Sequence, residues 1–220
     1  MSSATANLAL ASLFLPLSHF LIASTALRDK LVRRWGERPY TRAYSLLSVA
    51  AFIWLGFAYA NAPAVALWPS PRWLEPALVP LMLLAGILVV GGLTTPNPVI
   101  VRSEALFQQP DVVRGILRIT RNPFFWGVSL IAVAYMALLP TVAAFLAFGS
   151  VALLGLAGSV ILDAKKARRH GAAWNAFAQC TSDLPFLAIA QGRQKLVAAE
   201  IGAWRIVGGA MLGVAVFYLR

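Results

Sequence analysis

Long apolar stretches recur along this chain, and they constrain its fold more than any other feature. About 20 apolar residues are needed to cross the hydrocarbon core of a bilayer as an α-helix. Six stretches approach this length: 8–27, 43–59, 76–93, 123–139, a stretch from the turn at 140–141 to 162, and 201–219. The sequence therefore predicts an all-α fold, a single polytopic transmembrane helical bundle over residues 1–220. It has about six spans, or five if the weakest is lost.

The composition of the chain also fits an integral membrane protein. Hydrophobic residues make up 60% of the sequence and charged residues 12%, whereas a soluble domain is usually about a quarter charged. The single cysteine, Cys180, excludes an intrachain disulfide and a cysteine-based metal cluster. Residues 1–7 contain no lysine or arginine, so the first apolar stretch is expected to be a retained span and not a cleaved signal peptide.

The net charge of +11 does not indicate a nucleic-acid-binding protein, because the basic residues lie in short connections between the apolar stretches. With the N-terminus outside, only Arg72 and Arg220 of the 19 lysines and arginines fall on the outer side. Basic residues concentrate on the cytoplasmic side of membrane proteins. The sequence therefore predicts cytoplasmic basic loops, both ends outside, the lipid bilayer as partner, and no nucleic acid.

Two polar connections are expected to contain short amphipathic helices at the membrane surface. The first begins at Pro110 and continues to Thr120, with its apolar residues at spacings of three and four. The second covers residues 171–186, in which Trp174 and Phe177 are one helical turn apart. Such helices place an apolar face on the bilayer or the bundle and a polar face in water.

The block Arg118–Gly127 introduces the fourth apolar stretch. Pro123 suits the first turn of a helix, where backbone N–H groups have no partner within the helix. Asn122 stands at the N-cap position, and Arg118 and Arg121 make the entry basic. The block is therefore predicted to begin a membrane helix at the inner surface of the bundle.

His19 is the only histidine within a predicted span, and an ionisable residue there is a functional candidate by default. A neutral imidazole can ligate haem or a metal, or it can make an interhelical hydrogen bond. Tyr135 lies in the fourth stretch, roughly 20 Å above its inner end, and His19 lies roughly 12 Å above the same surface. The two could face each other across a buried pocket if their helices are neighbours, although an ordinary hydrogen bond is the simpler role for Tyr135. His170, in a basic run, is expected to be a solvated surface residue.

The sequence shows no Ser/His/Asp set, no paired carboxylates and no metal-ligand cluster. Acidic residues are almost absent from the apolar stretches, and Asp163 lies at the end of one. Acid–base catalysis by carboxylates, a proton relay and an ion pathway are therefore not expected within the membrane.

Several motifs, in this order, resemble the NnrU family of bacterial membrane proteins. They are His19, Tyr44-Ser45-Leu46, the block Arg118–Gly127 with the helical hairpin after it, residues 163–174, residues 181–186, and Gly192-Arg193. The resemblance covers nearly the whole chain. It implies a protein of the bacterial inner membrane that is linked to denitrification, in the expression or activity of nitrite and nitric oxide reductases. It also implies haem b, because the family is related to zeta-carotene isomerase, an integral membrane enzyme that uses haem b.

The chain departs from this family at two positions. Relatives typically have Arg-His-Pro where this chain has Arg121-Asn122-Pro123, and they tend to have a histidine at about the position of Tyr135. Of the family's histidines only His19 is clearly kept, so ligation of haem by two histidines is excluded. A single histidine or a phenolate can still ligate ferric haem. The resemblance thus implies cofactor contacts at His19, Tyr135 and Asn122, with His19 as the metal ligand.

The resemblance also gives Arg118 and Arg121 a role as contacts to haem propionates or to a phosphate at the cytosolic face. A guanidinium can make paired hydrogen bonds to such groups. The alternative is that both arginines serve only as membrane anchors and topology signals.

A second resemblance concerns the same block. It is similar to the Arg-His-Pro-x-Tyr-x-Gly segment of integral membrane methyltransferases that act on isoprenylcysteine or phospholipids. In those enzymes acidic residues after the hairpin help to hold S-adenosylmethionine, and here that acidic pair is reduced to Asp163. Three functions therefore stay open: a haem-binding, isomerase-like protein, a methyltransferase-like protein that uses S-adenosylmethionine, and a membrane assembly or scaffold factor without chemistry of its own.

Overall fold

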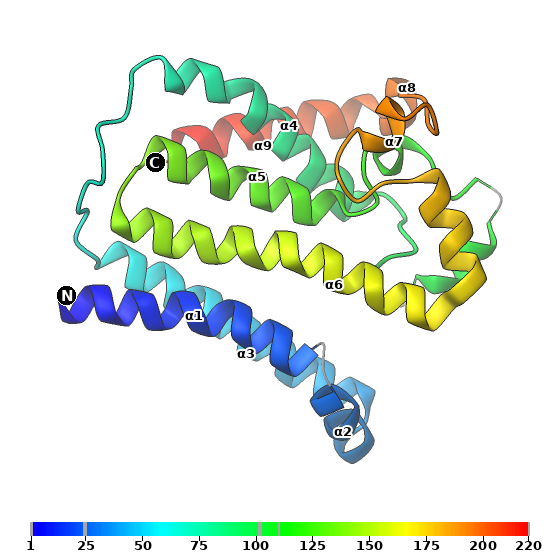
Figure 1. The fold of residues 1–220 in the computed structure, drawn as a ribbon, viewed down its shortest axis with the longest axis horizontal. Helices are drawn as coiled ribbons and strands as arrows, with labels where there is room; N and C mark the ends of the chain where they lie inside the picture. The colour runs from blue at the N-terminus through cyan, green and yellow to red at the C-terminus, as the bar shows by residue number, and fades with distance from the viewer. Residues whose placement is uncertain (1, 24–25, 101–102, 110, 220) are drawn as a thin grey trace. The chain divides into compact units, whose positions relative to one another are not determined.

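The computed structural model describes residues 2–23, 26–100, 103–109 and 111–219, and no β-strand occurs among them (Figure 1). Its α-helices and 3-10 turns are α1 (Ser3–Ala23), α2 (Ala26–Trp35), α3 (Glu37–Ala60), α4 (Leu74–Thr94), η1 (Glu104–Gln108), η2 (Gly115–Arg118), α5 (Pro123–Leu138), α6 (Val142–Cys180), α7 (Leu187–Ala190), α8 (Ala198–Ile201) and α9 (Ala203–Tyr218). Two loops meet at an isolated antiparallel bridge between Ala66 and Thr141.

Six of the described helices carry the six predicted apolar stretches. By length and composition, α1, α3, α4 and α6 can each cross a bilayer. The other two, α5 and α9, are also apolar but have only 16 residues each. The predicted helical membrane bundle is therefore confirmed, whereas the sidedness of the loops stays a prediction.

The helices form two compact units. The first contains Met1–Leu74 and Ala132–Leu154, and the second contains Glu75–Ile131 and Gly155–Arg220. Helices α5 and α6 contribute a segment to each unit. A single domain over residues 1–220 stays a prediction.

In the first unit, α1 and α3 lie side by side (Figure 1). Leu8 and Leu15 of α1 pack with Ala51 and Leu55 of α3, and the start of α6 adds Ala147 to the same buried cluster. Small residues at such positions let membrane helices approach closely. The basic connection between the two helices, predicted as a loop, is mostly helical and forms α2.

In the second unit, α5 and α9 both pack against α4. Gly86 of α4 meets Gly209 of α9 so closely that a Cβ added at Gly86 would stand 2.1 Å from the Gly209 carbonyl oxygen. Gly92 of α4 approaches α5 in the same way, because an added Cβ would stand 2.5 Å from the backbone nitrogen of Phe124. Glycine is therefore required at these contacts, where backbones touch without intervening side chains.

The connection between α4 and α5 differs from its prediction. Pro110 lies outside the described residues, residues 111–114 are not helical, and only the short turn η2 follows. The predicted amphipathic helix is therefore wrong. Gly115 has a φ of 58°, which a right-handed helix does not allow, and its N–H donates to Glu200 Oε2 at 2.8 Å.

Helix α6 is longer than the predicted fifth span. It continues through the basic run after Asp163, bends at Gly171, where φ is 48°, and ends at Cys180. Lysine, arginine and alanine are good helix formers, so the polar run does not end the helix. Trp174 and Phe177 lie on it as predicted and are buried together, but residues 181–186 form a turn and not more helix.

Candidate functional site

In the second unit, backbone hydrogen bonds join the turn after α6, residues 181–186, to residues 119–121, which precede α5. The Arg121 N–H donates to the Ser182 carbonyl at 2.9 Å, and the Phe186 N–H donates to the Ile119 carbonyl at 2.8 Å. Neither segment belongs to a helix, so these bonds satisfy backbone groups that have no partner within a helix. As a result, Asp183 is held beside the first turn of α5.

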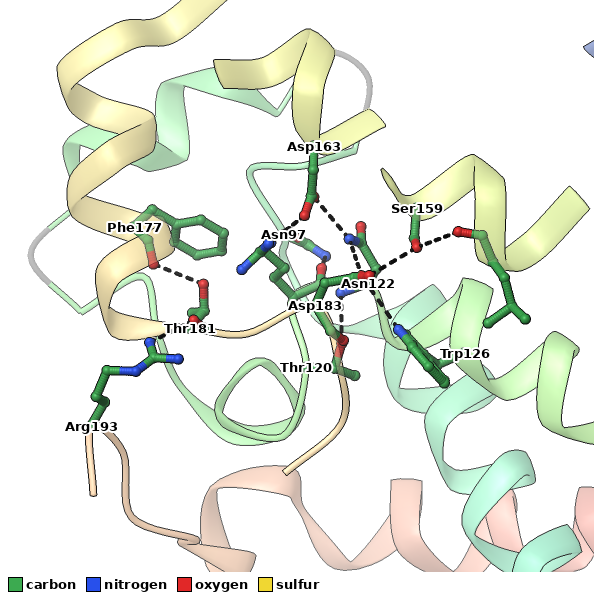
Figure 2. Close-up of polar contacts among 12 residues, drawn as sticks. Asn97, Thr120, Asn122, Trp126, Ser159, Asp163, Phe177, Thr181, Asp183 and Arg193 are labelled. Carbon is green, nitrogen blue, oxygen red and sulfur yellow. Dashed lines mark hydrogen bonds and ion pairs between the residues drawn. The ribbon is translucent and has the colours of Figure 1, made fainter. Parts of the chain in front are cut away.

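Asn122 is at the centre of the polar contacts in Figure 2. It is buried, with 3% of its surface exposed. Its Nδ2 lies 2.9 Å from Asp163 Oδ1 on α6 and 2.9 Å from Asp183 Oδ1. An amide group has two N–H bonds, so it can donate one to each carboxylate. Its own carbonyl accepts the N–H of Trp126 at 3.2 Å, so the residue also begins α5 as predicted.

The two carboxylates are stabilised in different ways. Asp163 Oδ2 accepts from Nε of Arg121 at 2.7 Å, and the guanidinium lies over the ring of Trp174, 5.5 Å from its centroid. Asp183 accepts from three neutral side chains: Asn122 at 2.9 Å, Ser159 at 3.1 Å and Trp126 at 3.3 Å. The cluster therefore contains two carboxylates and one guanidinium, which contacts only Asp163 of the two, so it has one negative charge in excess when both carboxylates are ionised.

This arrangement is a carboxylate pair, so the expectation that the chain has none is wrong. Asn122 and Asp183 are 61 residues apart in the chain, and Asn122 and Asp163 are 41 apart. Two neighbouring carboxylates favour a cation or a proton near them. The bridging amide does not titrate near neutrality, so Asn122 can donate and position but cannot itself exchange a proton.

An open groove of about 860 Å³ lies against this cluster. Its polar lining includes Arg121, Asp183, Asn175, Gln179, Gln191 and Arg193. The Arg193 guanidinium donates to the Gln179 carbonyl at 2.6 Å, next to the end of α6. It also donates to the Thr181 carbonyl at 2.8 Å (Figure 2). A cation is favourable at that end of a helix. The groove thus offers both charge signs and several amide groups to a polar ligand.

His19 lies on α1 in the first unit, and a hydrogen bond to its own helix orients its ring. Nδ1 is 2.8 Å from the Leu15 carbonyl oxygen. The ring also meets Tyr44 and Phe52 of α3 at steep angles, with centroid distances of 5.5 and 6.3 Å. Because a carbonyl can only accept, Nδ1 carries the proton, and in the neutral ring Nε2 keeps its lone pair.

Tyr135 lies near the end of α5, also in the first unit, and is 8% exposed. Its ring stacks on Phe148 of α6 at 4.7 Å, and Phe148 in turn meets Tyr59 of α3 at 5.4 Å. Tyr59 is about 10 Å further along α3 than Phe52. His19 and Tyr135 therefore connect to different parts of α3, and no ring contact among the described residues joins them.

Arg118 and Arg121 both have acidic partners in the second unit. Arg118 binds both carboxylate oxygens of Glu200, at 2.7 and 2.9 Å, and also donates to Gln194 at 2.7 Å. The hydrogen bond from Arg118 is the main reason why the pKa of Glu200 lies below its ordinary value, and the same bond raises the pKa of Arg118. A contact of either arginine with a propionate or a phosphate stays a prediction, and it would have to share or replace these partners.

His170 is not the solvated residue that its basic surroundings predict. Its Nε2 is buried and has no hydrogen-bond partner among the residues that the structure describes. Its ring packs against Phe107, with 5.2 Å between the centroids. That prediction is therefore wrong, and the imidazole is part of the apolar packing around the bend of α6.

The predicted site residues fall into two sets. His19 and Tyr135 belong to the first unit, and Arg118, Arg121 and Asn122 belong to the second. In the second set, Arg121 and Asn122 meet at Asp163. The contacts that sequence reasoning missed come from Asp183, Ser159 and Trp126. The one available signal for Asp183 was its place in the motif 181–186.

Comparison with known proteins adds one finding. A family model described as NnrU protein matches residues 7–219, which include Asp163, Asp183 and the whole block Arg118–Gly127. No curated protein and no solved structure matches the chain.

Proposed function

This chain belongs to the NnrU family, and on that premise we propose that it binds haem b through His19 and acts in denitrification at the bacterial inner membrane. The observation that carries the haem proposal is the orientation of the His19 ring. Its Nδ1 is held by the Leu15 carbonyl, which leaves Nε2 as the nitrogen that can bind iron. Histidines that ligate metals almost always have their other nitrogen held by such an acceptor.

The surroundings of His19 also support a flat apolar cofactor. The residue lies on a helix long and apolar enough to cross the bilayer, and its ring neighbours are aromatic. Tyr135 stacks on its own partner, Phe148 of α6, so the proposal uses His19 as the one protein ligand. Bound haem iron would supply redox and ligand-binding chemistry that no side chain of this protein provides.

The absorption spectrum of the purified protein tests the haem proposal. Protein from haem-replete cells should show a Soret band that is lost in His19→Ala and kept in His170→Ala, the matched control. A folded but colourless wild-type protein would refute the proposal. So would a Soret band of equal intensity in the two variants.

The role in denitrification needs a separate test in cells. A strain lacking this gene should lose much of its nitrite or nitric oxide reduction, and wild-type protein should restore it. His19→Ala, expressed at the same level, should not. Full restoration by His19→Ala would separate the physiological role from haem binding.

A second candidate function is methyl transfer from S-adenosylmethionine, and one observation favours it. Asp183 lines the groove and shares the Asn122 amide with Asp163, so a second carboxylate lies close to the one that the resemblance uses. Titration calorimetry with S-adenosylmethionine tests this candidate. Binding that is lost in Asp183→Asn would support it, and the absence of measurable binding by the wild type would remove it.

A further inference from the structure

Helix α2 and the start of α3 carry five cationic side chains with no acidic partner among the residues that the structure describes. Lys30, Arg33, Arg34, Arg38 and Arg42 are all exposed, and none forms an ion pair with a described carboxylate. The neighbouring Arg28 differs, because it is paired with Glu37 at 2.7 Å and with Asp29 at 3.6 Å. Both acidic residues of this segment pair with Arg28, so its six basic and two acidic side chains leave a net charge of +4.

The same helix has an exposed apolar stripe. Leu27, Leu31 and Trp35 are four residues apart, so they lie on one face of α2. Leu27 and Trp35 are 43% and 49% exposed and Leu31 is partly exposed, so the described residues leave much of this face uncovered. Lys30, Arg33 and Arg34 are three and four residues apart and form an adjacent face. An apolar stripe beside a basic stripe is typical of a helix that lies in the membrane–water interface.

Contacts within the first unit fix α2 at one end of the α1–α3 pair (Figure 1). The Tyr40 hydroxyl of α3 donates to the Ile22 carbonyl at the end of α1, at 3.2 Å. Arg28 of α2 lies over the Tyr40 ring, 5.5 Å from its centroid. Both α1 and α3 are long and apolar enough to span a bilayer. Their shared end, and α2 with it, therefore belongs at the level of the lipid headgroups.

We propose that α2 and the first turns of α3 form a binding surface for anionic phospholipids. The five unpaired cations complement the phosphate groups, and Leu27 and Trp35 enter the boundary between headgroups and acyl chains. A guanidinium binds phosphate oxygens in pairs, and clusters of four to eight basic residues beside a membrane span are attracted to anionic lipid. This surface is independent of His19 and of the carboxylate pair.

Quenching of Trp35 by brominated lipid tests the proposal on the full-length protein. The protein is reconstituted in phosphatidylcholine vesicles with equal small fractions of brominated phosphatidylglycerol or brominated phosphatidylcholine. The signal of Trp35 is the difference between wild type and Trp35→Phe. We expect severalfold more quenching by the anionic lipid, since each cation at the surface contributes roughly fivefold in affinity. The preference should weaken at high salt, because exposed charges are screened.

Matched variants separate charge from packing. K30Q/R33Q/R34Q should lose the preference for phosphatidylglycerol, whereas R33K/R34K and the distant Arg72→Gln should keep it. Equal quenching by the two lipids in the wild type would overturn the proposal, and so would full preference in the triple variant. If the triple variant does not fold, a wild-type preference that is insensitive to salt would overturn it equally.

Discussion

Asp163 and Asp183 accept hydrogen bonds from one and the same nitrogen, the Nδ2 of Asn122, each at 2.9 Å. The link between the two carboxylates is thus a neutral amide, at the position where the family resemblance implies a histidine. Of the two, only Asp163 has a cationic partner in the described part of the chain, and it is Arg121. The stability of the pair consequently depends on a donor that carries no charge.

Substitution of Asn122 tests this dependence. Asn122→Ala removes the donor that both carboxylates share and should cost about 1–3 kcal/mol of unfolding free energy. Asn122→Asp adds a third carboxylate and should cost more, whereas Asn122→His restores one N–H donor as a neutral imidazole, or two as an imidazolium, and should cost less than alanine. Thermal unfolding in mild detergent, monitored by circular dichroism, ranks the stabilities of the three variants. Equal stability of the aspartate and histidine variants would refute the bridging role.

The ion pair between Arg121 and Asp163 is expected to be energetically coupled. Either Arg121→Gln or Asp163→Asn should cost about 1.5–3 kcal/mol, because a largely buried charged group loses its charged partner. The double variant should cost less than the two single variants together. Arg169→Gln, an exposed substitution on the same helix as Asp163, serves as the control and should change little. If the loss of unfolding free energy in the double variant equals the sum of the two single losses, the two side chains do not interact.

The glycine contact between α4 and α9 gives a prediction with a neighbouring control. Gly209→Ala should destabilise the protein by about 1–3 kcal/mol, because a Cβ there would stand 2.4 Å from the Ile87 Cα. Gly208→Ala, one residue earlier, meets no atom within 4 Å and should be neutral or stabilising by up to about 1 kcal/mol. Unfolding temperatures in one detergent compare the two. A similar loss of stability in both variants would contradict the prediction, because it would show that the close contact at Gly209 does not determine the effect.

The pairing of Arg118 with Glu200 predicts a pH dependence of stability. The folded pKa of Glu200 lies below its ordinary value of 4.5, so its contribution is fully present above about that pH. The contribution is then lost as the pH falls through the folded pKa. Glu200→Gln should therefore lower stability at neutral pH, by at most about 1 kcal/mol for a partly exposed pair, and should match the wild type in acid.

Unfolding temperatures between neutral pH and acid pH measure this difference. Asp111→Asn is the control, since Asp111 makes no ion pair with a described residue. A gap between wild type and Glu200→Gln that persists in acid would contradict the assignment.

The membrane helices could be predicted because length and apolarity alone define them. The predicted stretches 76–93 and 123–139 lie within two residues of α4 and α5 at both ends. Pro123 marked the start of α5 correctly, because its conformation and missing N–H suit only that turn of a helix. Each of these signals is local, and a bilayer leaves few alternatives to a helix.

The predictions that failed concern regions whose structure depends on non-local contacts, or on a backbone conformation that the residue type does not determine. Gly115 is compatible with a helix or with a positive φ, and Glu200, 85 residues away, is the acceptor that its N–H meets in the structure. Asp183 reaches Asn122 only because the backbone after α6 turns and pairs with residues 119–121. Neither contact leaves a periodic pattern in the sequence. The family motifs therefore marked the region of the carboxylate pair without revealing the pair.

Helices α5 and α9 have 16 residues each, so each rises only about 24 Å. The hydrocarbon core of a typical bilayer is about 30 Å thick, and a helix shorter than this forces the lipid to thin around it. Long acyl chains would therefore be compressed beside these two helices, and short chains would not. The protein should accordingly unfold at a higher temperature in bilayers of short-chain lipids, and it should partition toward the thinner regions of a mixed membrane.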